Sequence, residues 1–156
     1  MDPLQQLLRV RELRLDGLRA ELARELAALR AVDEELTVAA SEVARAALQR
    51  TIWEHDWQQW LRHDGVLRHG QDYNLSHVAL SAWEQDAREV HDEIAVRREQ
   101  AAVIVGEVRQ RVLQAERRCA ALREQLQTLR RQWLARHAAL MDSRANDEAA
   151  ARRVAV

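Results

Sequence analysis

Three of the six histidines gather in one stretch near the middle of this sequence. They are His63, His69 and His77. Imidazole groups are zinc ligands, and three histidines would leave a catalytic zinc ion with one open coordination position. The histidine spacing matches neither an i, i+4 pair on a helix nor a known ligand motif, so it favours solvated histidines in a turn. We expect no metal site here.

Other patterns that carry enzyme chemistry are missing from the sequence. It contains no glycine-rich phosphate-binding loop, no His-Glu-x-x-His pair and no nucleophile elbow. Its single cysteine, Cys119, excludes an intrachain disulfide framework and a multi-cysteine metal site. We therefore expect a protein without catalytic residues or cofactors, which acts by binding other proteins.

Large aromatic side chains lie close to the same central stretch. Four of the five tryptophans are found there: Trp53, Trp57, Trp60 and Trp83. Each indole can bury about 150–250 Å² of surface. These side chains either hold the end of a hairpin together or form a partly exposed aromatic patch that binds a partner. Two packed helices cannot cover four indoles completely, so the two roles are compatible.

Arginine supplies all 24 basic residues, against 25 acidic residues, for a formal net charge of -1. A nearly neutral chain has no overall field that would attract nucleic acid or an anionic membrane. Acidic neighbours such as Glu12 and Glu116 favour a solvated, salt-bridged face. The excess of arginine toward the two ends of the chain would also suit an acidic-lined protein pore or ring. The candidate partner-binding arginines are Arg9, Arg11, Arg14, Arg130 and Arg131.

Long helices must position these side chains. The chain is 47% hydrophobic and 31% charged and has only four glycines and one proline, a composition typical of long helices. Apolar residues recur about every 3.5 residues, as in a coiled coil. The pattern predicts a helix over 3–62, a turn over 63–75, a second helix over 76–141, and a tail over 142–156 that is either frayed or ordered by a partner. The longest apolar run is far shorter than the ~20 residues of a membrane-spanning helix.

The heptad seams of the two predicted helices match when the chain is folded about Gly70. In that register Leu8 lies opposite Trp133, and Trp57 lies opposite Trp83. The sequence therefore predicts a single all-α domain, 1–156, built as a long antiparallel two-helix coiled-coil hairpin. Polar side chains that either fix the register or extend into solvent occupy four seam positions, Arg11, Glu25, Arg50 and Arg98.

The opening stretch over residues 7–16, LLRVRELRLD, resembles the start of the coiled-coil stalk proteins of type III secretion and flagellar export, the FliJ/YscO family. Chain length, a single turn near the middle and a tryptophan-containing segment over 80–85, LSAWEQ, are similar as well. The resemblance covers most of the chain, although the number of tryptophans departs from the family pattern.

The resemblance implies a cytoplasmic protein that is peripheral to the inner-membrane export apparatus and does not insert into the membrane. It implies binding to a hexameric secretion ATPase and to the cytoplasmic domain of the export gate, with export chaperones as a further class of partner. The residues that match the family's opening, and are implied in the ATPase contact, are Leu8, Arg9, Val10, Arg11 and Arg14.

Two other functions remain open from the sequence. A coiled-coil chaperone or adaptor would bind secretion clients through the tryptophan-rich end and the tail without affecting ATP hydrolysis. A polymerase-accessory hairpin would insert acidic residues of the turn, Asp64 and Asp72, into an enzyme channel that leads to a metal centre.

Overall fold

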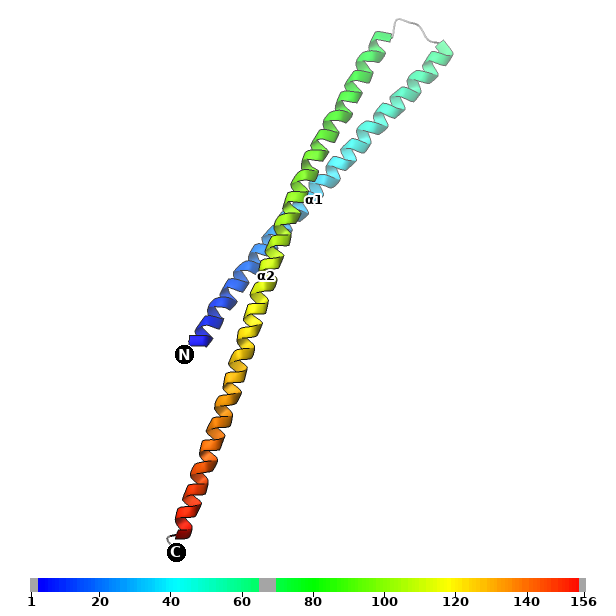
Figure 1. The fold of residues 1–156 in the computed structure, drawn as a ribbon. Helices are drawn as coiled ribbons and strands as arrows, with labels where there is room; N and C mark the ends of the chain where they lie inside the picture. Colours follow the sequence, from blue (N-terminus) through cyan, green and yellow to red (C-terminus); the bar gives the residue numbers. More distant parts are fainter. Residues whose placement is uncertain (1–2, 65–69, 155–156) are drawn as a thin grey trace. The chain divides into compact units, whose positions relative to one another are not determined.

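The structure is a computed structural model that describes residues 3–64 and 70–154, and it is helical throughout these ranges (Figure 1). Helix α1 spans Pro3–Asp64, which is 62 residues. Helix α2 spans Gly70–Val154, which is 85 residues. The described ranges contain no strand. The predicted all-α hairpin of two long helices is confirmed.

The residue types of both helices explain why neither is interrupted. Leucine, alanine, arginine, glutamate and glutamine dominate both segments, and all are strong helix formers. The one proline, Pro3, stands in the first turn of α1. The N–H groups of a first turn make no hydrogen bond within the helix, so the lack of an N–H in proline costs no bond there. Basic Arg62 and His63 end α1, and acidic Asp72 begins α2, so each opposes the partial charge of its helix end.

Three predicted helix boundaries are wrong. Helix α1 continues to Asp64 instead of ending at residue 62, and α2 begins at Gly70 instead of residue 76. Helix α2 also continues to Val154, through the predicted tail, because residues 142–154 are rich in alanine and arginine and contain neither glycine nor proline. Of the predicted turn over 63–75, residues 65–69 lie outside the described residues, and the rest is helical.

The chain packs as two units, each made of one segment of α1 and one segment of α2. The terminal unit comprises Met1–Ala20 and Arg109–Val156, and the central unit comprises Glu21–Val108. The core of the terminal unit consists of Leu15, Val112, Cys119 and Leu122. The core of the central unit consists of Ala39, Ala46, Ala87, Ile94, Val105 and Val108. Both cores use small and medium side chains, as two closely packed helices require.

The predicted register is also wrong. A register centred on Gly70 would set Glu12 opposite residue 128 and Asp33 opposite residue 107. Instead Glu12 bonds to Arg123 in the terminal unit, and Asp33 bonds to Arg98 in the central unit. These partners lie earlier in α2 by about one heptad, because α2 begins earlier than predicted. A shift of seven residues returns each seam residue to a seam position, so the hydrophobic pattern allows both registers.

Candidate protein-interaction surfaces

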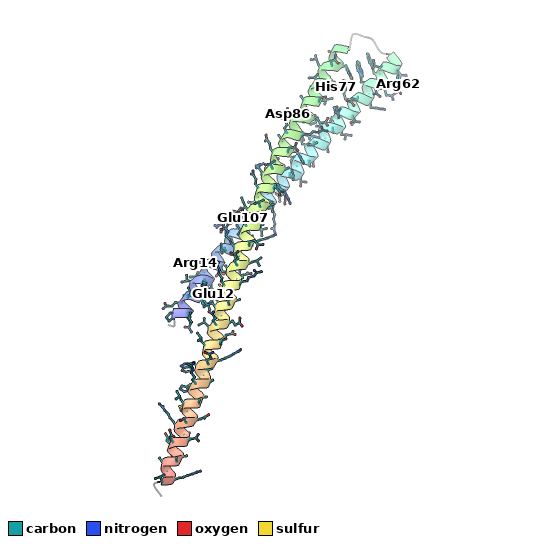
Figure 2. The ribbon with its side chains drawn as sticks, in the orientation of Figure 1. Glu12, Arg14, Arg62, His77, Asp86 and Glu107 are labelled. Atoms are coloured by element: carbon teal, nitrogen blue, oxygen red, sulfur yellow. The ribbon has the colours of Figure 1, made fainter. Side chains whose placement is uncertain are left out.

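Four arginines line one groove in the terminal unit, which we call the arginine groove. Arg11 and Arg14 approach it from α1, and Arg111 and Arg118 approach it from α2; the remaining lining residues are Leu18, Gln114 and Ala115. Residues three apart, like the first pair, and seven apart, like the second, share one face of a helix. Figure 2 labels Arg14 beside Glu12 on the part of α1 that belongs to this unit.

The carboxylates next to the arginine groove are engaged by other arginines. Arg123 donates from Nη2 to Oε1 of Glu12 at 2.6 Å, and Arg19 donates from Nη2 to Oε1 of Glu116 at 2.9 Å. Among the described residues, no carboxylate pairs with either α1 arginine of the groove. These bonds run between the two helices, whereas the sequence predicted pairs along one helix, and they leave the groove with an excess of positive charge.

The two units differ strongly in charge. The terminal unit contains 15 arginines and 8 acidic residues, a formal charge of +7, whereas the central unit contains 9 arginines and 17 acidic residues, a formal charge of -8. Within the terminal unit, hydrogen bonding to Glu12, and next the negative charge of Glu12, raise the pKa of the Arg123 guanidinium above its ordinary value. The net charge of the whole chain, -1, hides the opposite charges of its two units.

The other predicted arginines do not join the groove. Arg9 is exposed and is not one of the lining residues. Arg130 lines a different hollow, together with Gln5, Leu129 and Trp133. Arg131 is exposed on α2. The predicted set is thus distributed over the surface of the terminal unit, and the structure brings together only Arg11 and Arg14 with two arginines of α2.

A stack of aromatic rings joins the two helices in the central unit, and we call it the aromatic stack. The ring centroid of Tyr73 on α2 lies 4.3 Å from Trp53 and 4.3 Å from Trp57 on α1. Trp60 extends the stack, with its centroid 4.8 Å from that of Trp57. The ring of His77 lies 5.9 Å from that of Tyr73, and its Nε2 is 3.3 Å from Oε1 of Glu54.

The aromatic stack both holds the helices together and remains accessible. Its three tryptophans are half-buried, and together with Asp56 they line an open hollow on α1. Aromatic pairs at these separations add about 0.5–1.5 kcal/mol each beyond the burial of their area. Both predicted roles of the tryptophans, a clamp and a binding patch, are therefore compatible with the geometry.

Trp83 takes a different place from the one its predicted register gives it. Its Nε1 donates to Oε1 of Glu42 at 3.0 Å, and the guanidinium of Arg45 lies 5.7 Å from its ring centroid. The rings that contact Trp57 are those of Trp53, Trp60 and Tyr73. The predicted pairing of Trp83 with Trp57 is wrong because the register differs by about one heptad.

The structure describes some of the histidine and aspartate residues near the predicted turn. His63 is exposed at the end of α1, and His77 contacts the aromatic stack. His69 lies outside the described residues, and the side chain of Asp64 is likewise not described. Within residues 3–64 and 70–154 no group of three or more histidine, cysteine, aspartate or glutamate side chains could hold a metal ion. Asp72, the other residue of the predicted acidic tip, is exposed in the first turn of α2.

A partly buried ion pair crosses the seam of the central unit. Glu84 is 5% exposed, and its two carboxylate oxygens accept hydrogen bonds from Arg50 of α1 and Arg88 of α2. Arg98, the other seam arginine of this unit, donates from Nε to Oδ1 of Asp33 at 3.0 Å. Both seam arginines thus reach a carboxylate on the opposite helix.

Sequence reasoning missed Arg111, Tyr73 and Glu84 as members of these sites, and it placed Arg118 in an arginine cluster without choosing it as a partner-binding residue. The spacing of Arg111 and Arg118 could have placed them on one face, but only the correct register places that face beside Arg11 and Arg14. Tyr73 was missed because it fell in the predicted turn.

Comparison of the chain with known proteins found no relative. Neither a protein-family model, nor a curated protein, nor a solved structure matches the chain. None of the helices in the described ranges has the length and hydropathy needed to cross a membrane.

Proposed function

We propose that this protein is a coiled-coil stalk that couples a hexameric type III secretion ATPase to the cytoplasmic domain of the export gate. In this proposal it has no catalytic activity of its own. It is cytoplasmic and peripheral to the inner-membrane export apparatus, and it also contacts export chaperones. It binds neither nucleic acid nor the membrane interior.

The arginine groove is the observation that carries the proposal. Its α1 arginines, Arg11 and Arg14, belong to the opening stretch that resembles the secretion stalk family. No carboxylate of the described residues pairs with either of them, so both are available to bind a partner. Guanidinium groups bind carboxylates with two parallel hydrogen bonds, which gives both strength and orientation. An ATPase ring with acidic side chains on its inner surface would therefore bind this face. A stalk that contacts the subunits unequally would link its position to their nucleotide state.

The test is to measure ATP hydrolysis by the purified ATPase while the concentration of this protein is raised. We expect a saturable increase in turnover. The triple variant Arg9→Glu, Arg11→Glu, Arg14→Glu should require at least about tenfold more protein for the same increase, because like charges then meet across the interface.

A matched triple variant controls for the change in net charge. Arg24, Arg30 and Arg62 are exposed on the part of α1 that belongs to the central unit, and their reversal to glutamate alters net charge equally. This control should stimulate the ATPase as the parent does. Unchanged turnover with the parent protein, or equal losses in both triple variants, would contradict the proposal.

The aromatic stack favours a second candidate function, a chaperone or adaptor that binds secretion clients. The open hollow beside Trp53, Trp57 and Trp60 offers indole faces to an apolar segment. This candidate predicts that clients bind to the protein and that Trp60→Ala weakens their binding, with no effect on ATP hydrolysis. A client affinity that does not change in Trp60→Ala would exclude the stack as the binding surface.

A further inference from the structure

The last part of α2 has an apolar stripe that the described residues of α1 leave largely uncovered, and we call this stripe the tail face. Its members are Leu126, Leu129, Trp133 and Leu140, spaced by three, four and seven residues, so they lie on one side of the helix. Leu126 is half-buried, whereas Leu129, Trp133 and Leu140 are 47%, 62% and 62% exposed. All residues from 127 to 154 are exposed. Figure 1 shows this part of α2, in orange and red, without a helix beside it.

The tail face continues the seam between α1 and α2 within the terminal unit. Leu122 occupies the same heptad series and is buried against α1. The first turn of α1 reaches as far as a hollow that Gln5 lines together with Leu129 and Trp133. Helix α1 begins at Pro3, and beyond that hollow no described residue of α1 packs against the seam positions of α2. A second helix in line with α1 would extend the same packing.

The charges beside the tail face select the kind of helix that fits. Residues 125–141 include Arg130, Arg131 and Arg136 and contain no aspartate or glutamate. Arg130 and Arg136 also line the hollow at the start of the stripe. Arg130 lies next to seam residue Leu129, and Arg136 occupies the seam position between Trp133 and Leu140, so acidic side chains of a partner helix would pair with both. The fitting helix therefore has an apolar stripe with acidic residues on its flanks.

A second copy of this chain fits less well. If the stripes of two copies packed together, the arginines of one copy would face the arginines of the other. If the stripe instead met residues 142–154 of the second copy, it would face a segment whose apolar side chains are mainly alanine. A membrane surface also fits less well, because the stripe is narrow and keeps the spacing of a coiled-coil seam.

We propose that the tail face is the docking site for an acidic amphipathic helix of another protein. The proposal goes beyond the stalk function, because it involves other residues than the arginine groove and does not require an ATPase. Residues 127–154 are all exposed and so gain little from tertiary packing, which supplies most of the stability of helices in proteins. Docking would therefore also stabilise the helical form of residues 127–154.

The experiment uses the full-length protein and a synthetic peptide of about three heptads, with leucine at the seam positions and glutamate beside them. Repulsion between glutamates keeps the peptide from pairing with itself. We expect saturable binding in fluorescence anisotropy of the labelled peptide, weakened by added salt. A peptide with arginine in place of glutamate should bind at least about tenfold more weakly. Hydrogen exchange of residues 127–154 should slow when the acidic peptide is bound.

Two variants locate the site. Trp133→Glu places a carboxylate on the tail face and should weaken peptide binding by at least about tenfold. Val38→Glu makes the same change at an exposed apolar residue of the central unit and should leave the affinity unchanged. Equal binding of the acidic and arginine peptides, or equal affinity of Trp133→Glu and the parent, would overturn the proposal.

If the tail face binds a second copy of the chain or a membrane instead, different results are expected. A dimer in analytical ultracentrifugation that Trp133→Glu converts to a monomer would assign the face to a second copy. Binding to anionic phosphatidylglycerol vesicles, lost in Trp133→Glu and without peptide binding, would assign it to a membrane surface. Either result overturns the acidic-helix proposal, and neither alters the ATPase prediction for the arginine groove.

Discussion

Arg50 donates a hydrogen bond from Nε to Oε2 of Glu84 at 2.6 Å and so joins α1 to α2 inside the central unit. The carboxylate is almost fully buried, and Arg88 engages its second oxygen. A buried carboxylate that keeps its charge needs such partners, because desolvation alone would cost several kcal/mol.

Removing one side of this pair should destabilise the hairpin. Arg50→Leu leaves a buried negative charge with only Arg88, and we expect the free energy of unfolding to fall by about 2–4 kcal/mol. Urea unfolding followed by circular dichroism measures this change. The double variant Arg50→Leu, Glu84→Leu should recover most of the loss, because two apolar residues can replace a buried pair. A double variant as unstable as Arg50→Leu would show that the pair matters for packing and not for charge.

The aromatic stack depends on Tyr73, whose ring lies against both Trp53 and Trp57. Tyr73→Ala should lower the free energy of unfolding by about 1–3 kcal/mol and reduce the near-ultraviolet circular dichroism of the tryptophans. Tyr73→Phe keeps the ring and should retain both stability and spectrum. Thermal unfolding of the three proteins measures the difference. Similar losses in both variants would assign the effect to the hydroxyl instead of the stacked ring.

Cys119 is 1% exposed in the core of the terminal unit. A buried thiol reacts only when the surrounding structure opens, so labelling by a disulfide reagent should be at least about a hundredfold slower in the native protein than in urea. The rate should rise as urea approaches the unfolding midpoint. Rapid labelling in the absence of urea would mean that the two helices separate readily at this layer.

Gly17 and Gly106 lie inside long helices, and an added Cβ at either position would meet no atom within 4 Å. Gly17→Ala and Gly106→Ala should each raise the free energy of unfolding by about 0.5–1 kcal/mol, because alanine restricts the unfolded chain and favours helix. Urea unfolding tests each variant. Destabilisation by either alanine would reveal that the glycine is needed for a close approach of the helices.

The bond from Arg123 to Glu12 should not make stability depend on pH near neutrality. Glu12 raises the pKa of Arg123 in the folded protein. A raised folded-state pKa contributes stability that is complete below the unfolded-state pKa and is lost only as pH rises through the folded-state pKa, which is strongly alkaline. The parent and Glu12→Gln should therefore keep a constant difference in unfolding free energy from pH 7 to 9. A difference that changes within this range would point to another titrating group.

The hydrophobic pattern was sufficient to predict two long helices but not how they are paired. Leu15, Leu122 and Cys119 were correctly assigned to the seam, since burial follows the heptad spacing. The register was wrong because it rested on a predicted turn that was too long, and a seven-residue repeat fits equally well after a shift of seven residues.

The error in register explains why the observed neighbours of the candidate residues differ from the predicted ones. Trp133 was predicted to lie opposite Leu8, but in the observed register the residue opposite Leu8 lies about one heptad earlier in α2, and Trp133 is 62% exposed. The same shift separates Trp83 from Trp57 and replaces it with Tyr73. Arg11 and Arg14 were identified from their residue type and position alone, whereas their partners in the groove required knowledge of the pairing.

Glu84 also distinguishes the native register from its nearest competitors. A slip of one heptad along α1 would replace Arg50 by Val43 or Trp57, neither of which can neutralise a buried carboxylate. If only apolar layers held the helices together, such slipped hairpins would lie close in energy to the native hairpin and would persist as misfolded states. One ion pair therefore widens the energy gap between the native pairing and its neighbours, and it directs a repetitive sequence to a single folded state.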